Sequence, residues 1–417
     1  MKILKSIIAT LTAIAVFIPV TAQNNVNTPY SRFGYGVLGD RASSSQRAMG
    51  GVGYAMSNGR QINVMNPASY AAIDSLTFLF DIGITGKLLN SRQGEEKGNN
   101  FNAGLDYITM QVPIGKYMGA SVGLLPYSQV GYSFGQEVVN GESAYQGSGT
   151  INQAYLGVAG RPFKGFSIGA NISYLFGTLL NDNYTTSTNG SESLFEQSIT
   201  VRDYELNFGL QYGFNIGRKH RVTIGAVYSP GKDFRGDAMA IMYDVNQNST
   251  KPDTIGFTKL GKTASRPATY GGGLSYTWNN SITAEADFTY QPWKNCKIPT
   301  FEGFDRSTFA DRWKAALGLQ YIPDSRGSYM RRVSYRLGAY YNRDYVMVGD
   351  NNVKDLGLTL GLGLPAPINR WTKTVVNVGF EYRRRTSSPV KLVTENYFQF
   401  TIGVNFNELW FWQNKIQ

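Results

Sequence analysis

The sequence predicts an all-β protein, an antiparallel transmembrane barrel of about fourteen strands. Segments of about ten residues alternate apolar and polar side chains, and this period of two is typical of strands with one apolar face and one face in contact with water. No stretch of 18 apolar residues follows the N-terminal export signal, so a helical membrane span is not expected. Alternating strands behind an export signal are the pattern of outer-membrane β-barrels.

The first residues have the features of a cleavable signal peptide. Lys2 and Lys5 precede an apolar run from Ile7 to Val20, and small residues lead up to Ala22. The run is too short for a spanning helix, which needs about 20 apolar residues. We expect residues 1–22 to be removed on export, and we place the mature chain in the outer membrane of a Gram-negative bacterium.

The final alternating segment, 397–406, shows how the two faces of the wall are assigned. Phe400 and Ile402 lie on one face, and Gln399 and Thr401 lie on the other. A charge that faces the middle of the bilayer costs about 2–4 kcal/mol, so the polar faces are expected to line the lumen. We expect this strand to close the barrel against the first one, 77–89, because an open edge in lipid would leave backbone groups unpaired.

Aromatic residues near strand ends predict girdles at the two membrane interfaces. The residues are Trp278, Tyr290, Trp293, Trp313 and Tyr321. The connections alternate between short turns and long polar loops, which in bacterial barrels face the periplasm and the outside, respectively. The expected long loops are 90–104, 135–149, 181–197, 230–265, 292–311, 344–355 and 386–395.

Six charged side chains fall on lumen faces. The bases are Lys314, Arg336 and Arg383, and the acids are Glu285, Asp287 and Glu381. Two interpretations are open. The charges are the polar filling that any barrel interior needs, or the bases bind the carboxylate of a passing substrate and have the acids as resting partners.

Cysteine and histidine usage narrows the function classes. Cys296 and His220 are the one cysteine and the one histidine of the chain, so a zinc site built from these ligands is not expected. No nucleophile elbow accompanies His220, and we expect no enzyme activity and no cofactor or metal. Nucleic acid is not an expected partner. The net charge of +11 is compatible with attraction to anionic surface lipids.

Residues 23–76 show no alternation of apolar and polar side chains, and they are too rich in small and apolar residues to be a flexible tail. They predict a compact plug, or hatch, of short helices and turns inside the lumen. The expected domain order is therefore signal peptide 1–22, hatch 23–76, barrel 77–406 and periplasmic tail 407–417.

The hatch carries a specific resemblance. The motif Arg47-Ala48-Met49-Gly50-Gly51, followed by Asn66-Pro67-Ala68, resembles the N-terminal hatch of the long-chain fatty acid transporter (FadL-type) outer-membrane family. Segments at 228–238, 266–293 and 311–318 resemble later strands of that family in the same order. The resemblance covers the chain from about residue 40 to its end and implies a hatch motif at Gly50, Gly51, Asn66, Pro67 and Ala68.

The resemblance also implies a mechanism. It implies a monomeric barrel that takes up hydrophobic compounds and releases them sideways at a kink in the third strand. Pro126 is the candidate for that kink, since proline cannot donate a ladder hydrogen bond. A plain strand end or bulge at Pro126 is the alternative. The loops 181–197 and 243–262 are polar, so no hydrophobic capture groove or fatty-acid specificity is assigned.

Two functions remain open at this point. The first is passive uptake of a hydrophobic or amphipathic small molecule through a hatch-gated channel. The second is a structural or accessory barrel subunit of an outer-membrane secretion or assembly complex. Outer-membrane lipid, the barrel-assembly machinery during insertion and protein partners at the outer membrane complete the expected partners. A connected apolar pocket of a few hundred Å³ beside the hatch would favour uptake, and a polar interior would argue against it.

Overall fold

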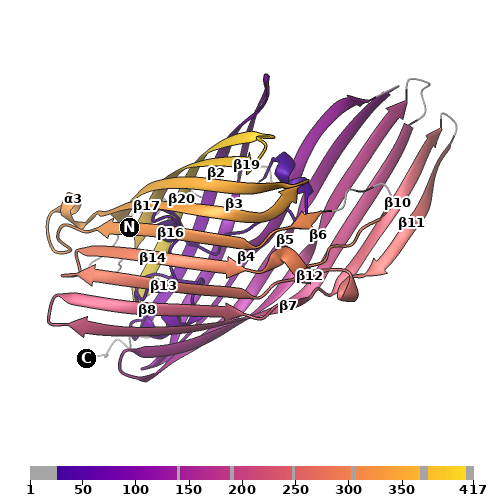
Figure 1. Cartoon of the computed structure of the whole chain (residues 1–417). Coiled ribbons are helices and arrows are strands. Elements are labelled where there is room, and N and C mark those ends of the chain that lie inside the picture. Colours follow the sequence, from indigo (N-terminus) through magenta and orange to yellow (C-terminus); the bar gives the residue numbers. More distant parts are fainter. Residues whose placement is uncertain are drawn as a thin grey trace, which may run out of the picture.

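The wall of the molecule is one antiparallel sheet that closes on itself (Figure 1). The computed structural model describes residues 26–138, 141–187, 192–246, 249–301, 304, 307–366 and 374–409, so the predicted signal peptide lies outside the described residues. Within them, fourteen strands form the closed wall, as predicted. These strands are β2 (Thr77–Gln93), β3 (Glu96–Gly115), β4 (Met118–Val138), β5 (Gly141–Phe163), β6 (Phe166–Ser187), β7 (Glu192–Ile216), β8 (His220–Ser229), β13 (Thr269–Trp278), β14 (Ile282–Gln291), β16 (Arg312–Tyr321), β17 (Ser334–Val348), β18 (Asn351–Pro365), β19 (Val375–Ser388) and β20 (Thr394–Leu409).

Smaller elements lie in the N-terminal segment and the loops. The remaining strands are β1 (Val37–Leu38), β9 (Lys232–Asp233), β10 (Gly236–Asn246), β11 (Ser249–Lys259), β12 (Ser265–Arg266) and β15 (Thr308–Phe309). The helices are η1 (Pro29–Arg32), α2 (Ser44–Arg47), η2 (Pro67–Ala72), η3 (Leu260–Lys262), η4 (Trp293–Asn295) and α3 (Tyr329–Arg332). In the described chain, no helix has the length and apolar character needed to cross a membrane.

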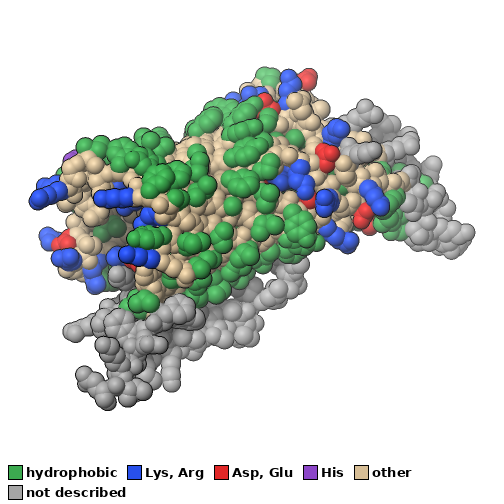
Figure 2. Space-filling view, turned by 90° about the horizontal axis from the view of Figure 1, so that it is seen from below, with side chains coloured by type: hydrophobic (Ala, Val, Ile, Leu, Met, Phe, Trp, Pro, Cys, Tyr) green, Lys and Arg blue, Asp and Glu red, His purple; other side chains and the backbone are tan. Residues whose placement is uncertain are grey.

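The two faces of the wall follow the alternation of the sequence. In β20, Phe400 and Ile402 point outward and are exposed, whereas Gln399 and Thr401 are buried on the inside. This strand pairs with β2 from Thr77↔Leu409 to Arg92↔Thr394, so the predicted closure is confirmed. Figure 2 shows the resulting surface, with hydrophobic side chains across the body of the barrel and charged side chains gathered toward its ends.

The strands differ in length around the barrel. β5, β6 and β7 have 23, 22 and 25 residues, whereas β8, β13, β14 and β16 have 10 each. The long strands project beyond the short ones on one side, where the β10–β11 hairpin extends the sheet by pairing with β7 (Figure 1).

Several predicted loops are therefore wrong. Most of the described parts of 90–104, 135–149 and 181–197 are strand, and 230–265 contains the β10–β11 hairpin. The reason is that these outer segments carry Asn, Ser and Thr on both faces, so no apolar face marks them as strands. Strand pairing with long neighbours still satisfies their backbone groups.

Candidate functional site

The N-terminal segment, residues 26–76, runs through the lumen and contacts the inner face of the wall. At the end of the barrel with the short turns, which we call the short-turn end, η2 packs against β5 and β6. Asn66 caps this helix by accepting a hydrogen bond from the Ala68 N–H at 3.0 Å, and its amide donates to the carbonyl of Leu210 in β7 at 3.1 Å. The Asn66-Pro67-Ala68 motif thus fixes a helix start and ties it to the wall.

Gly50 and Gly51 form a tight turn just after α2. Both have positive φ, 75° and 77°, a region that favours glycine. The Gly50 N–H donates to Thr359 Oγ1 at 2.8 Å, and a Cβ on Gly50 would lie 2.8 Å from the carbonyl oxygen of Leu317. The turn therefore approaches the wall too closely for a larger residue.

An aromatic layer closes the opposite end of the lumen, the long-loop end. Tyr35 of the N-terminal segment packs edge-on to Phe234 with ring centroids 5.1 Å apart, and Trp293 packs on Tyr345 at 4.3 Å. Tyr35 and Tyr345 also bond to backbone carbonyls, at 2.7 Å to Lys297 and 2.6 Å to Gly36. We call Tyr35, Phe234, Trp293, Phe309 and Tyr345 the mouth core. The prediction that Trp293 belongs to an interface girdle is wrong, because only 1% of its surface is exposed.

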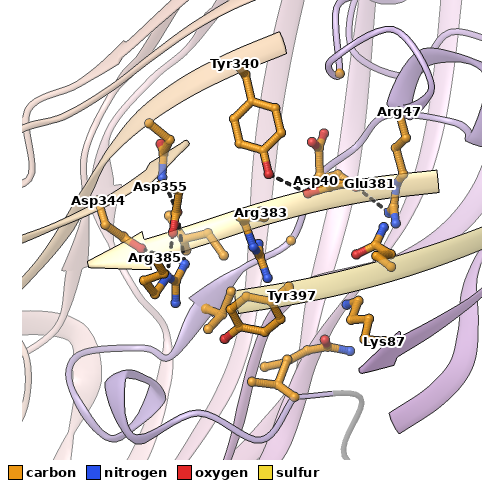
Figure 3. A pocket seen from close by; sticks show the side chains of 18 of the residues that line it. Asp40, Arg47, Lys87, Tyr340, Asp344, Asp355, Glu381, Arg383, Arg385 and Tyr397 are labelled. Atoms are coloured by element: carbon orange, nitrogen blue, oxygen red, sulfur yellow. Dashed lines mark hydrogen bonds and ion pairs between the residues drawn. The ribbon is translucent and has the colours of Figure 1, made fainter. Parts of the chain in front are cut away.

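Two cavities lie between the mouth core and the turn after α2. They measure about 130 and 120 Å³ and share lining residues from the N-terminal segment and from Pro126, Arg312 and Lys314. Charged side chains dominate the first cavity, as Figure 3 shows. Its charged lining consists of Asp40, Arg47, Lys87, Asp106, Arg312, Lys314, Asp344, Asp355, Glu381, Arg383 and Arg385.

Ion pairs connect the N-terminal segment to the wall around these cavities. Arg47 pairs with Asp106 at 2.8 Å and Arg41 with Glu205 at 2.5 Å, and all four side chains are largely buried. Arg385 of β19 pairs with Asp355 at 2.6 Å and with Asp344 at 3.2 Å, in the wall itself.

Asp40 pairs with Lys314 at 3.1 Å but keeps 38% of its side-chain surface exposed. Burial raises the pKa of Asp40, but the charges of Lys314 and Arg47 outweigh burial and lower this pKa to about 2. Asp40 is therefore charged at neutral pH.

The predicted resting pairs among the six lumen charges are wrong. Asp287 accepts the backbone N–H groups of Gly53 and Tyr54 at 2.6 and 2.9 Å. Glu381 accepts from Tyr340 at 2.5 Å, and Glu285 is buried with no hydrogen-bond partner for Oε2 among the described residues.

The three predicted bases also have different partners from one another. Lys314 bonds to Asp40, and Arg336 donates to Gln320 at 2.8 Å and to Asn377 at 2.7 Å, both in the wall. Arg383 faces the first cavity, with its guanidinium 4.0 Å from the centroid of the Tyr397 ring.

Sequence reasoning missed Lys87, Arg47 and Arg385 as cavity residues. A signal was present in the run Arg383-Arg384-Arg385, because alternation puts the first and third on one face. Cys296 is not a candidate site residue. Burial raises the pKa of its thiol to about 11, so the thiol stays protonated.

The ladder between the second and third wall strands is incomplete. β3 pairs with β4 only from Ile108↔Leu124 to Gly115↔Met118, so in the described structure residues 96–107 pair with β2 alone. Pro126 lies where the two strands separate, next to a register shift in the β4–β5 ladder. β1 pairs with β4 beyond this point, with Leu38 opposite Ser128. The N-terminal segment thus covers part of the edge that β3 leaves free, and we call the separation of β3 and β4 the seam.

The closed wall, its outward apolar face and the filled lumen define an outer-membrane β-barrel with the fold of FadL-type channels. Solved structures agree over nearly the whole chain. The Pseudomonas putida toluene transporter TodX matches with a TM-score of 0.63 at 13% identity, covering 90% of this chain and 100% of that one. The Ralstonia pickettii toluene transporter TbuX matches with a TM-score of 0.59 at 15% identity, covering 88% and 99%. A Pseudomonas aeruginosa FadL homologue matches with a TM-score of 0.62 at 10% identity, covering 89% and 99%.

The family model BamG matches residues 3–417, and the chain belongs to the BamG family. No curated protein matches the chain. The structural relatives named above are transporters or transporter homologues rather than enzymes. Since their identity to this chain is 10–15%, they establish its fold alone.

Proposed function

We propose that this protein is a plugged, accessory barrel subunit of an outer-membrane secretion or assembly complex. The filled lumen carries the proposal. The mouth core closes one end, η2 fills the other, and two lumen cavities of about 130 and 120 Å³ lie among charged side chains. A binding site for a hydrophobic cargo is instead a mostly apolar pocket of about 300–1,000 Å³.

A basic surface at the short-turn end supports a docking role. Nine basic residues and one acid lie in the turns 115–117, 161–165, 217–221, 279–281 and 322–333, which gives these turns a net charge of +8, against +11 for the whole chain. We call the nine the basic rim: Lys116, Arg161, Lys164, Arg218, Lys219, Arg221, Arg326, Arg331 and Arg332. The single His220, purple in Figure 2, marks this end, where blue side chains gather. Such a surface fits an acidic periplasmic face of a partner protein.

Affinity purification from outer membranes in a mild non-ionic detergent tests the proposal. We expect the tagged barrel to elute with other outer-membrane or periplasmic proteins in a fixed ratio. Replacing Arg218, Lys219 and Arg331 by Gln should reduce this ratio, because it removes three rim charges. A matched control replaces Arg92, Lys97 and Lys391, which are exposed near the long loops, and should not change it. Recovery of the monomer alone would contradict the accessory role.

A second function, uptake of an amphipathic small molecule with lateral exit, is favoured by one observation. The seam beside Pro126 adjoins the first cavity, which Pro126 and Asn102 line from the β4 and β3 sides. TodX and TbuX, which share the fold, are toluene transporters by name. Pro126→Thr restores a ladder donor and should slow uptake of a labelled hydrophobic compound by cells. Unchanged uptake would remove the seam as the exit.

A further inference from the structure

Three cations at the first cavity lack an acidic partner among the described residues, and one of them, Arg312, donates instead to the side chain of Gln291 at 2.9 Å. Among the described residues, Lys87 of β2 and Arg383 of β19 have no carboxylate oxygen within 4.0 Å. The neighbouring cations Arg47 and Lys314 each have one, and Arg385 has two. The difference matters because a charge removed from bulk water is costly unless it is paired and hydrogen-bonded.

The guanidinium of Arg383 is held in place, but not all of its N–H groups have a hydrogen-bond acceptor. Its guanidinium stacks 4.0 Å from the centroid of Tyr397, whose hydroxyl donates to Glu395 at 2.8 Å. Its Nε is buried and has no hydrogen-bond partner in the described structure. Stacking on an aromatic face fixes the plane of a guanidinium while its N–H groups remain available for a planar anion.

Lys87 faces the same cavity as Arg383, with Tyr397 beside both in Figure 3. Arg47, Asp106 and Glu381 line this cavity together with Lys87 and Arg383. Gln399 and Asn102 add amide groups to the lining. Six basic and five acidic side chains line the cavity, and Asp344 and Asp355 share Arg385, so the lining has a net charge of +1 when all of these groups are ionised.

We propose that Lys87 and Arg383 form a binding site for a carboxylate or phosphate group. The cavity of about 130 Å³ is large enough for such a group together with a few waters, since one water needs about 10–15 Å³ measured in this way. A bidentate guanidinium contact and an ammonium contact would neutralise the anion, as at other phosphate and carboxylate sites. The site does not depend on the accessory role proposed above.

The position of the site defines two sources of the anion. The cavity is lined from both sides of the seam, by Asn102 of β3 and Pro126 of β4. A free anion could reach the cavity through the loops, and the head of an amphipathic molecule could reach it through the seam with its tail in the membrane. Both sources present the same charged group to Lys87 and Arg383.

Calorimetric titration of the purified full-length barrel in a non-ionic detergent tests the site. The probes are inorganic phosphate and dodecyl phosphate at constant ionic strength, with sodium chloride as the blank. If both probes bind, the ligand of the site is a free anion. If dodecyl phosphate alone binds, the ligand is the headgroup of an amphipathic molecule. Absence of binding for both would overturn the proposal.

Substitutions place the binding at this cavity. Lys87→Met with Arg383→Met should weaken the affinity for whichever probe binds by about ten- to a hundredfold, because it removes two charge-assisted contacts. Arg384→Gln is the matched control, since Arg384 is the next residue of β19 and is exposed on the other face. Arg383→Lys, which keeps the charge, should retain part of the affinity. Heat-dependent gel mobility verifies that each variant is folded, and equal affinity of the folded double variant and the original chain would refute the site.

Discussion

The mouth core and the charged layer beneath it close the same lumen by different physical means. The mouth core buries aromatic rings from the N-terminal segment, the loops and β17, and its two tyrosine hydroxyls donate to backbone carbonyls. The charged layer holds the N-terminal segment to the wall through ion pairs that surround two cavities of about 130 and 120 Å³. The mouth core therefore closes its end of the lumen with packed rings, whereas the charged layer leaves the space and the charge that the proposed anion site requires.

The largest expected effect is the loss of an aromatic ring from the mouth core. Trp293 is fully buried and contacts Tyr35, Phe309 and Tyr345. Trp293→Ala should lower the free energy of unfolding in lipid vesicles by about 3–5 kcal/mol, because it leaves a cavity among these rings. A loss below about 1 kcal/mol, measured by urea titration, would show that the mouth core does not seal the barrel as a packed unit.

A smaller effect is expected from a buried ion pair of the charged layer. Arg47→Met leaves Asp106 buried without its cation and should cost about 3 kcal/mol in the same titration. Replacing both partners, Arg47→Met with Asp106→Leu, should recover much of the loss. No recovery would mean that Arg47 stabilises the barrel mainly through its other contacts.

Asp287 tests how the wall positions the turn after α2. Its carboxylate accepts two backbone N–H groups of the N-terminal segment, from Gly53 and Tyr54. Asp287→Ala should cost about 2–3 kcal/mol, since two buried donors lose a charged acceptor. It should also speed protease cleavage in residues 50–60. Unchanged cleavage together with unchanged stability would contradict the positioning role.

The smallest effect is expected at the pair of Lys314 and Asp40, whose side chains are 14% and 38% exposed. Lys314→Met removes the partner of Asp40, which is 38% exposed and can be hydrated by the cavity. The expected loss is below about 1 kcal/mol. A loss as large as that of Arg47→Met would show that exposure to the cavity does not screen these charges.

The wall could be predicted from the sequence because alternation is a local signal. Phe400 and Gln399 take opposite faces by neighbouring positions alone. The long outer parts of β5, β6 and β7 could not be predicted, because both of their faces are polar outside the membrane.

The pairing of charged side chains in the lumen could not be predicted from the sequence for a different reason. Lys314 meets Asp40 across 274 positions of the chain, a contact set by the path of the N-terminal segment. The signal peptide, the gating role of the hatch and the lateral exit at Pro126 stay predictions.

Ion conductance in a planar bilayer tests the closed lumen most directly. The full-length barrel should insert and show no stable open level, because the mouth core and the N-terminal segment fill its lumen. The same barrel without residues 26–72 should conduct, which verifies that insertion occurred. Stable conductance by the full-length barrel, equal to that of the shortened one, would show that the lumen is open.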